Sequence, residues 1–515
     1  MQRDTPHEDR RALAEARRLE AKGDLTGALS AYQAALDARP DDPAILTGIG
    51  RLALALDMAP AAESVLKRSL AFLPSEPEAT SLLARSLSAQ GRSGQAIDVL
   101  REQVLADPLD ARIWNQLGLL VAEQGDLASA ETFLREALRL KPNLTPARFN
   151  LGNLQMSSGD ATAALETFLS VRVGGLTARE RAILNFSRAC ARLRLGDLAR
   201  GWTDYAARND PAFPGAAAFD IPGRRWRRGQ PLSGLDLLLV GEQGLGDEVL
   251  FAGLVPDLMA RLGPEGSLSL AVEPRLQRLF RRAFPAAQVI SHATVETGGR
   301  KIRRLATAVK PAAWAPMADL LPEFRPQADA FPERVGYLPP DPDRVAFWRR
   351  ALGAELPGPR VGLLWKSGMM NGGRANAFPS FEAWEPVLRT PGIAFVNLQY
   401  GDCAPEIALA GERFGLKVWT PPDIDLRNDL EDLSALSCAL DLVVGVSNAT
   451  FNLAAAAGAP AWLVAAPDAW TTLGTDRYPW YPQVRVHSCA RPGDWVPVME
   501  TIASDLRQYD FAASA

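Results

Sequence analysis

A proline recurs every 34 residues in the amino-terminal part of the chain, at Pro40, Pro74, Pro108 and Pro142. An alanine stands 12 residues before each of these prolines, and a glycine stands 17 residues before all but one of them, where Asp57 takes its place. A fixed period of this length indicates a tandem array of helical hairpins, in which each unit covers the apolar face of the next. We expect the glycine to turn the chain between two helices and the proline to open the connection to the next unit.

A 34-residue period is typical of the tetratricopeptide repeat, and we expect about six such units over residues 8–208. The small residues Gly50, Ala84, Gly118 and Gly152 share one register and should lie where paired helices approach closely. Arrays of this kind form a concave surface that binds a peptide or helix. The sequence therefore predicts a solenoid whose task is to hold a partner protein.

Beyond residue 208 the repeat stops, and a proline- and arginine-rich stretch over 209–232 reads as a linker. Short apolar runs then alternate with helical segments, which is typical of parallel sheets covered on both faces. The expected strands cover residues 235–240, 268–272, 288–290, 360–365, 393–398, 418–420, 440–446 and 461–464. Residues 301–343 are rich in proline and should carry the chain from one α/β lobe to a second.

Composition excludes several classes of function. The chain has 515 residues, a net charge of -4 and no basic tract, so we expect neither nucleic acid nor a membrane surface as partner. The chain has only three histidines and four scattered cysteines, so we expect no metal site built from these residues. The first 18 residues are charged and lack the apolar core of a signal peptide, which predicts a cytoplasmic protein.

A glycine-rich turn follows the first expected strand after the linker. Gly241, Gly244 and Gly246 would let the backbone approach a ligand, and Asp247 falls in the first turn of the next helix. The spacing matches neither the P-loop of nucleotide hydrolases nor GxGxxG. Asp247 is therefore either a helix cap or a carboxylate base aimed into a cleft, and Glu242 and Glu248 in the same turn stay open as alternative bases.

Two further strand ends carry polar groups that suit an anion. Lys366 and Ser367 follow the strand at 360–365, and Arg374 lies in the glycine-rich loop after them. Ser447, Asn448, Ala449 and Thr450 connect the strand at 440–446 to a helix, where exposed amides cap the helix or bind a phosphate. We favour the anion site, because a buried central strand leads into this turn.

These segments together resemble a known family. The run from Gly241 to Asp247, the strand at 361–365, Leu398 with Gln399, the stretch at 432–444, and the ending 479–482 with 493–495 are similar in order and spacing to heptosyltransferase-related glycosyltransferases fused to tetratricopeptide repeats. The combination resembles bacterial enzymes that glycosylate flagellins. The resemblance implies an α-helical solenoid followed by a GT-B fold of two Rossmann-like lobes, with an acceptor lobe at 233–335 and a nucleotide-sugar lobe at 336–515. It also implies a last helix near 496–506 that crosses back to the acceptor lobe.

The resemblance implies roles for individual residues. Asp247 would take the proton from an acceptor hydroxyl, in a loop that Gly244 and Gly246 shape. The donor phosphate would lie at the turn from Ser447 to Thr450, with Lys366, Ser367 and Gln399 as further contacts. Neither a metal nor a cofactor is expected, since the nucleotide sugar is a substrate and helix amides with a lysine can stabilise the departing phosphate.

The chain departs from the family at this turn. Heptosyltransferase relatives commonly read Asp-Thr-Ala-x-x-His where this chain reads from Ser447 to Asn452, so a carboxylate and an imidazole are absent. A neutral surface would tolerate a sugar that itself carries a carboxylate. We therefore expect a nonulosonic acid activated with cytidine monophosphate (CMP) as donor, and flagellin as the protein acceptor.

Two other functions remain open from the sequence. The lost acidic and imidazole side chains would also fit a repeat scaffold or chaperone with a degenerate transferase lobe. A transferase that acts on lipopolysaccharide sugars is the third interpretation, but a small saccharide needs no extended concave surface. The retained glycine turn, Asp247 and Lys366 favour the active protein glycosyltransferase.

Overall fold

The computed structural model describes residues 5–74, 76–297, 300–368, 378–467 and 469–512. The chain divides into two compact units, Met1–Leu154 and Gln155–Ala515. Among the described helices, none is long and apolar enough to cross a membrane.

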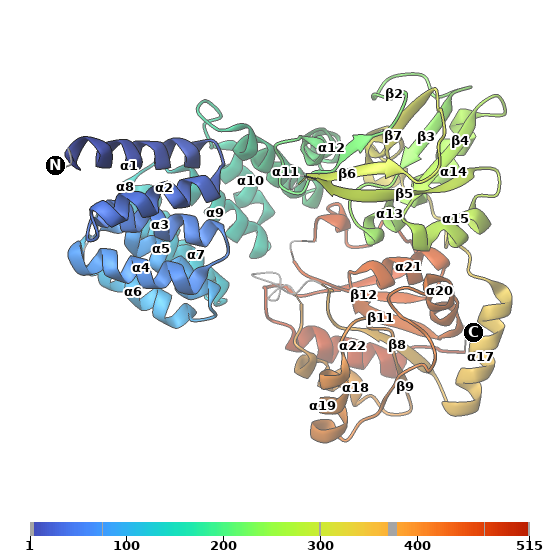
Figure 1. Ribbon diagram of the computed structural model, residues 1–515. Helices are drawn as coiled ribbons and strands as arrows, with labels where there is room; N and C mark the ends of the chain where they lie inside the picture. The colour runs from blue at the N-terminus through green and yellow to red at the C-terminus, as the bar shows by residue number, and fades with distance from the viewer. Residues whose placement is uncertain (1–4, 75, 298–299, 369–377, 468, 513–515) are drawn as a thin grey trace. The chain divides into compact units, whose positions relative to one another are not determined.

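The amino-terminal part is built from antiparallel helix pairs, as the repeat predicts (Figure 1). Each helix buries an apolar stripe against its neighbours, and the stripes of successive pairs form continuous clusters. The described residues form twelve α-helices before the first strand, which matches about six repeat units. They are α1 (Thr5–Ala21), α2 (Leu25–Ala38), α3 (Pro43–Ala55), α4 (Ala59–Phe72), α5 (Pro77–Ala89), α6 (Ser93–Ala106), α7 (Ala111–Glu123), α8 (Leu127–Leu140), α9 (Thr145–Ser157), α10 (Ala161–Leu169), α11 (Ala178–Arg194) and α12 (Leu198–Tyr205).

The recurring glycines turn the chain within the helix pairs because they adopt left-handed backbone angles. Gly23, Gly91 and Gly125 have φ values of 80°, 75° and 88°. Asp57, the exception in the sequence pattern, has a φ of 58° and occupies the same left-handed turn between α3 and α4. The backbone conformation is therefore maintained even where the glycine is missing, at the cost of strain in an L-residue.

The small residues in the repeat register lie at close helix contacts. A Cβ atom at Gly50 would come within 2.5 Å of Cγ of Leu66, and one at Gly118 would come within 2.8 Å of Cγ of Leu134. Both glycines lie on the first helix of a pair, and both leucines lie on the second. The predicted close approach is confirmed at these two positions.

The last helix pair belongs to the second compact unit. Leu198, Trp202 and Tyr205 of α12 lie in one buried cluster with residues of both sheets that follow. Nε1 of Trp202 donates to the backbone oxygen of Arg325 at 2.7 Å, and its ring packs edge-on against Trp480. The second compact unit begins at Gln155, and its core includes the last helix pair of the predicted repeat domain 8–208.

The first sheet has seven strands in the order β1-β6-β5-β4-β3-β7-β2, and only the pairing of β5 with β6 is antiparallel. Helices α13 (Leu245–Phe251), α14 (Val255–Leu262) and α15 (Gln277–Ala283) follow its strands. The strands are β1 (Ala218–Asp220), β2 (Arg224–Arg225), β3 (Asp236–Val240), β4 (Ser267–Val272), β5 (Gln288–Thr297), β6 (Arg300–Leu305) and β7 (Ala313–Pro316). The sequence predicted β3, β4 and the first part of β5.

Two of the predicted connections are partly sheet. The linker 209–232 contains β1 and β2, because Arg224 and Arg225 pair with Ala313 and Trp314 at the sheet edge and Phe219 packs on Trp314. The stretch 301–343 contains β6 and β7, and only its later part leads to the second sheet. These strands are short, or exposed and charged, so they lack the continuous apolar runs that identify buried strands.

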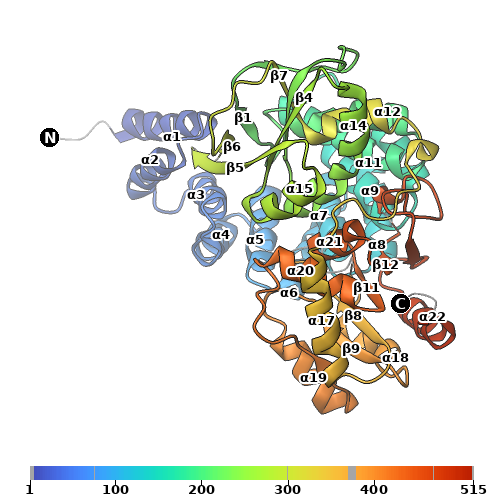
Figure 2. The ribbon, with the colours of Figure 1, turned by 90° about the vertical axis from the view of Figure 1, so that its right-hand side faces the viewer.

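The second sheet has six parallel strands in the order β10-β9-β8-β11-β12-β13. They are β8 (Arg360–Leu364), β9 (Ala394–Asn397), β10 (Val418–Trp419), β11 (Leu442–Val446), β12 (Ala461–Ala465) and β13 (Val484–Ser488). This is the strand order of doubly wound dinucleotide-binding sheets. Helices α17 (Pro342–Glu355) and α20 (Leu430–Ala439) pack together beside it (Figure 2). The other helices are α18 (Glu385–Leu388), α19 (Ala404–Phe414), α21 (Ala449–Ala457) and α22 (Val496–Gln508).

The last helix does not cross back to the first sheet. Val498, Met499 and Ile502 of α22 lie in the buried cluster on one face of the second sheet, together with Trp384 and Trp462. The predicted crossing is therefore wrong, since the apolar stripe of α22 is already buried against α18 and β13.

The strain at Asp57 gives a stability prediction. Asp57→Gly should slow amide exchange in α3 and α4 and stabilise this repeat by roughly 0.5–1 kcal/mol, because glycine adopts φ of 58° without steric cost. The reciprocal Gly91→Asp should destabilise α5 and α6 by a similar amount. Hydrogen–deuterium exchange of the full chain measures both, and unchanged or faster exchange in Asp57→Gly would contradict the argument.

His487 in β13 gives a prediction about pH. It is 6% exposed and packs against Trp462, and burial lowers its pKa to about 4, with Arg485 lowering it further and Asp505 opposing. The unfolded chain therefore binds a proton at His487 more readily than the folded chain. The contribution of His487 to the free energy of unfolding consequently falls as the pH drops below 6.5. Between pH 7 and 5 the wild type should lose about 2 kcal/mol more than His487→Gln in its free energy of unfolding. Urea unfolding at both pH values measures this, and parallel losses would refute it.

Candidate functional site

The predicted site residues lie at the topological switch points of the two sheets. In the second sheet the strand order reverses between β8 and β11, and in the first sheet β3 lies between β4 and β7. Ligands of open α/β sheets bind in the crevice beyond the carboxyl ends of such strand pairs. The turn after β3 carries Asp247, and the turns after β8 and β11 carry Lys366 and Ser447.

The glycine turn of the first sheet lies directly against the amino terminus of α21. A Cβ atom at Gly246 would lie 3.2 Å from Cα of Ala449, so the two backbones are nearly in contact. Nδ2 of Asn452 donates to the backbone oxygen of Gly246 at 3.3 Å. Helices α13 and α21 accordingly face each other between the sheets (Figure 1). The structure thus brings together the two turns that the sequence singled out separately.

Asp247 is half-buried at the start of α13. Its Oδ2 accepts a hydrogen bond from the backbone N–H of Gly244 at 3.0 Å, which is the capping interaction expected of a carboxylate in a first helical turn. This bond also fixes the orientation of the carboxylate at the mouth of the turn. Capping and a chemical role are therefore compatible at this residue.

Glu242 is held in a buried ion pair. Its carboxylate accepts hydrogen bonds from Nε and Nη2 of Arg208 at 3.0 Å each, and from the backbone N–H of Ala318 at 2.8 Å. Arg208 also donates to Asp319 at 2.6 Å. Although burial lowers the pKa of Arg208, these two carboxylates raise it above its ordinary value. The pair ties the last repeat to the glycine turn, and it occupies both oxygens of Glu242.

Glu248 is also buried, on the other side of the turn. One carboxylate oxygen accepts from the backbone N–H of Glu273 at 2.8 Å, and the other lies 2.8 Å from Nε2 of His292. The carboxylate lies directly beneath Gly241, where a Cβ atom would come within 2.2 Å of it. Glu248 therefore packs beneath the backbone of the turn. Of the three carboxylates, Asp247 is the one that is not buried.

The amino terminus of α21 is built by Asn448. Its Oδ1 accepts from the backbone N–H of Phe451 at 2.9 Å, and its Nδ2 donates to the backbone oxygen of Lys366 at 3.2 Å. Asn448 thus caps the helix and joins the ends of β8 and β11. The first amides of α21, at Ala449 and Thr450, take part in no hydrogen bond between described residues. They suit an anion approaching beside Ser447.

The remaining predicted donor contacts have structural partners. Nζ of Lys366 donates to the backbone oxygen of Asp402 at 2.8 Å and forms an ion pair with Glu406. Oε1 of Gln399 accepts from the backbone N–H groups of Trp365 and Lys366, which fixes the end of β8. Ser367 is buried beside this turn. Arg374 lies outside the described residues.

Two tyrosines at the site were not predicted. Tyr478 is buried, and its hydroxyl lies beside the side chains of Thr471 and Ser447. Burial raises the pKa of Tyr478 to about 12, although hydrogen bonds with these two side chains lower it, and the nearby negative charge of Asp247 adds to the rise. Tyr205 of α12 exchanges hydrogen bonds with the side chain of Gln243 at 2.9 and 3.2 Å. Sequence reasoning missed both, because an isolated tyrosine carries no local spacing signal.

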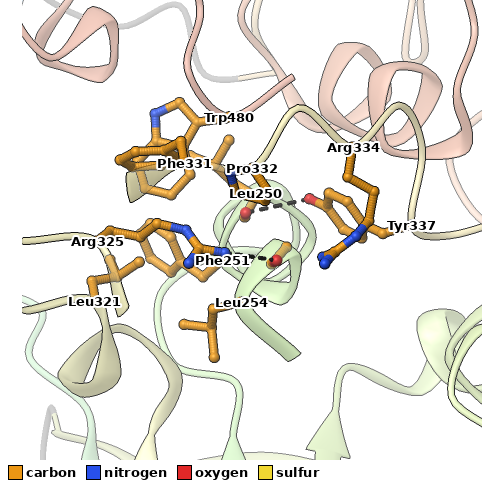
Figure 3. A pocket seen from close by; sticks show the side chains of 11 residues that line it. Leu250, Phe251, Leu254, Leu321, Arg325, Phe331, Pro332, Arg334, Tyr337 and Trp480 are labelled. Atoms are coloured by element: carbon orange, nitrogen blue, oxygen red, sulfur yellow. Dashed lines mark hydrogen bonds between the residues drawn. The ribbon is translucent and has the colours of Figure 1, made fainter. Parts of the chain in front are cut away.

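The structure has cavities of different sizes around these elements. A cavity of about 10 Å³ lies where Tyr337 and Arg325 donate to backbone oxygens of Leu250 and Gly253 (Figure 3). It is far too small for a nucleotide sugar and marks a structural joint. A groove of about 850 Å³ runs between α11–α12 and the first sheet, lined in part by Arg227 and Arg228.

The amino-terminal unit has a groove of its own. Its volume is about 570 Å³, and its lining includes Tyr32, Arg51 and Glu78. Arg51 forms ion pairs with Glu20 and Glu78 at 2.7 and 2.6 Å, so the groove is lined by alternating charges. No group of three or more metal-ligating side chains occurs within the described ranges.

Comparison with known proteins supports the repeat assignment and identifies a relative. Tetratricopeptide repeat models match residues 19–85 and 81–144. A thermophilic tetratricopeptide repeat protein of Thermus thermophilus is 26% identical, with a TM-score of 0.33 over 36% of this chain and 99% of its own. The peroxisomal targeting signal receptor of Kluyveromyces lactis is 35% identical over 77 residues, which are 15% of this chain and 14% of the receptor.

One relative matches almost the whole chain. Protein FlbA of Caulobacter vibrioides is 44% identical over 498 residues, which cover 96% of this chain and 83% of FlbA. The match includes the repeats and both sheets. The chain, a tetratricopeptide repeat protein with a carboxyl-terminal pair of parallel-sheet lobes, therefore belongs to the FlbA family.

Proposed function

We propose that the chain is a glycosyltransferase of GT-B type that moves a sugar from a nucleotide donor to a hydroxyl of a polypeptide, with flagellin as the acceptor. The observation that carries the proposal is the contact between Gly246 and the amino terminus of α21. It places a half-buried carboxylate, Asp247, beside amides suited to a phosphate. Both groups lie at switch points of parallel sheets, where such proteins bind ligands.

The chemistry follows from these two groups. Asp247 accepts the proton of the acceptor hydroxyl while that oxygen forms a bond to the anomeric carbon of the sugar. The bond between the anomeric carbon and the donor phosphate breaks, and the amides of Ala449 and Thr450 stabilise the charge on the departing phosphate. The hydroxyl of Tyr478, buried beside Ser447, is a further donor toward that phosphate.

The proposed donor is a CMP-activated nonulosonic acid. The side chains at the start of α21 are neutral, namely Ser447, Asn448 and Asn452, so α21 itself brings no negative charge against a carboxylate on the sugar. Oδ1 of Asn452 is buried without a hydrogen-bond partner among described atoms. An amino or hydroxyl group of the donor would satisfy it.

The proposed acceptor is a protein because tandem repeats of this kind form a concave surface that binds a peptide or helix. Tetratricopeptide repeat domains generally bind other proteins, and the amino-terminal groove carries charged side chains suited to a polar polypeptide. Flagellin is proposed from the resemblance to bacterial flagellin glycosyltransferases. In this account the repeats deliver the acceptor and the sheets perform the transfer.

Removing the carboxylate tests the proposal most simply. Asp247→Asn should slow sugar transfer to flagellin by about a hundredfold or more, since a general base contributes at least that factor. The rate is measured as added mass on intact flagellin. Glu265→Gln, which removes an exposed carboxylate elsewhere on the same lobe, is the matched control and should keep the wild-type rate.

The outcomes separate the two functional classes. If Asp247→Asn keeps full activity, the assignment of the base is wrong. If the wild type adds no mass with any candidate donor, the chain acts as a scaffold or chaperone for its partner.

The donor proposal gives a second prediction. CMP should bind the full chain at least about tenfold more tightly than uridine or adenosine diphosphate, a difference of about 1.4 kcal/mol. Calorimetry with the three nucleotides measures this, and Tyr478→Phe should weaken the binding of CMP. Equal affinities, or no binding of CMP, would count against the proposed donor.

A further inference from the structure

A separate cavity of about 240 Å³ lies on the acceptor-lobe side of the glycine turn. Its walls come from α11, the segment after α12, the glycine turn and the β5–β6 hairpin. Phe186 and Phe213 form an apolar wall, with ring centroids 4.8 Å apart. Gln243 lines the cavity and also belongs to the turn that leads to Asp247. A cavity of this size is below the range for a drug-sized ligand and suits one side chain.

Two cations that line the cavity have unused hydrogen-bonding capacity. Only 8% of the surface of Arg303 is exposed, and its Nε has no hydrogen-bond partner among the described atoms. Its Nη2 donates to the backbone oxygens of Glu242 and Gln243 at 2.5 and 2.9 Å, so the guanidinium is fixed in place. An unpaired polar atom at such depth is costly unless a ligand satisfies it.

Lys301 supplies the second cation. It lies on β6 two residues before Arg303, so both side chains share one face of the hairpin. Its cross-strand neighbour is Glu296, but the described residues include no ion pair of Lys301 with it or with any other carboxylate. The other charged lining residues, Arg208 and Glu242, are paired with each other. Arg303 lies 3.9 Å from the carboxylate of Glu248, so Lys301 is the cation of this lining that has no ion pair within the described ranges.

We propose that this cavity binds a carboxylate side chain of the acceptor polypeptide, close in sequence to the hydroxyl that receives the sugar. The proposal rests on the proposed function and names how its acceptor is recognised. Two N–H donors beside an apolar wall match the carboxylate and methylene groups of aspartate or glutamate. Gln243, shared by the cavity and the turn, places this subsite next to Asp247.

The lining identifies the polypeptide, and not the donor sugar, as the source of the carboxylate. Every lining residue belongs to the last helices or the first sheet with its connections, and none belongs to the second sheet, where the nucleotide is proposed to bind. The cavity shares Arg208 and Asn209 with the groove of about 850 Å³ beside α11 and α12. A polypeptide lying in that groove would therefore pass next to the cavity.

Kinetics with the full chain test the proposal. Lys301→Glu should raise the KM for flagellin about tenfold or more, since a charge-assisted hydrogen bond is lost and a repulsion is introduced, while kcat and the donor KM stay unchanged. Lys310→Glu, an exposed lysine of the same lobe that does not line the cavity, is the matched control. Replacing the acidic residues of flagellin near the modified hydroxyl by lysine should restore the KM of Lys301→Glu.

A binding measurement keeps the test independent of catalysis. Saturation-transfer NMR with N-acetyl-aspartate N-methylamide should give a signal with the wild type and Lys310→Glu, and a strongly reduced one with Lys301→Glu. The asparagine counterpart should give little signal with any of the three. This result is readable even if the chain transfers no sugar, so the failure of the proposed function and the failure of this subsite are distinguishable.

Each outcome of these experiments either supports or overturns the carboxylate subsite. A rise in flagellin KM with reversal by the lysine-bearing acceptor supports the subsite. A rise in the donor KM instead would assign the carboxylate to the sugar and overturn the proposal. Unchanged kinetics together with equal NMR signals for the aspartate and asparagine probes would overturn it as well.

Discussion

The near contact between Gly246 and Ala449 is the constraint on which the arrangement of the site depends. A Cβ atom at residue 246 would lie 3.2 Å from Cα of Ala449 and would push the two backbones apart by a few tenths of an ångström. Glycine therefore allows the end of β3 to lie against the beginning of α21. The hydrogen bond from Asn452 to Gly246 and the cap at Asn448 then fix the same helix end from two sides. A carboxylate at one switch point and helix amides at another are thereby brought to one place.

The last repeat contributes to this site in addition to the solenoid. The buried pair of Arg208 with Glu242 and the hydrogen bonds of Tyr205 with Gln243 hold the glycine turn from the side of α12. Removing one partner of a buried pair leaves an uncompensated charge, which commonly costs 3–5 kcal/mol. In a transferase that receives a polypeptide, such a connection would keep the acceptor path and the reacting groups in one rigid body.

Much of this architecture could be predicted from the sequence. The 34-residue period predicted the helix pairs, and even Asp57, which breaks the pattern, adopts the left-handed turn of the glycines. Buried strands such as β3, β8 and β11 have continuous apolar runs and were predicted nearly residue by residue. Strands β2 and β6 were missed, because their residues are polar or arginine-rich and only pairing with a neighbour makes them strands.

The site was predictable only in part, because tertiary contacts decide what each polar group is free to do. Sequence spacing could not distinguish Asp247 from Glu242 and Glu248. In the structure Glu242 is buried against Arg208 and Glu248 against His292, which sets both apart from Asp247. Lys366 looked like a phosphate ligand, but its ammonium group is held by Glu406 and Asp402. Tyr478 and Arg303 come from distant segments, and nothing near them in the sequence signals a shared site.

The central claim is that an activated sugar is held at the start of α21, opposite the turn that carries Asp247. Hydrogen–deuterium exchange of the full chain with and without saturating CMP tests it at the level of single segments. The account predicts that CMP slows exchange at residues 447–452 and at 243–248, and leaves the helices α3 to α6 unchanged. Protection confined to other segments, or none at any saturating nucleotide concentration, would contradict it.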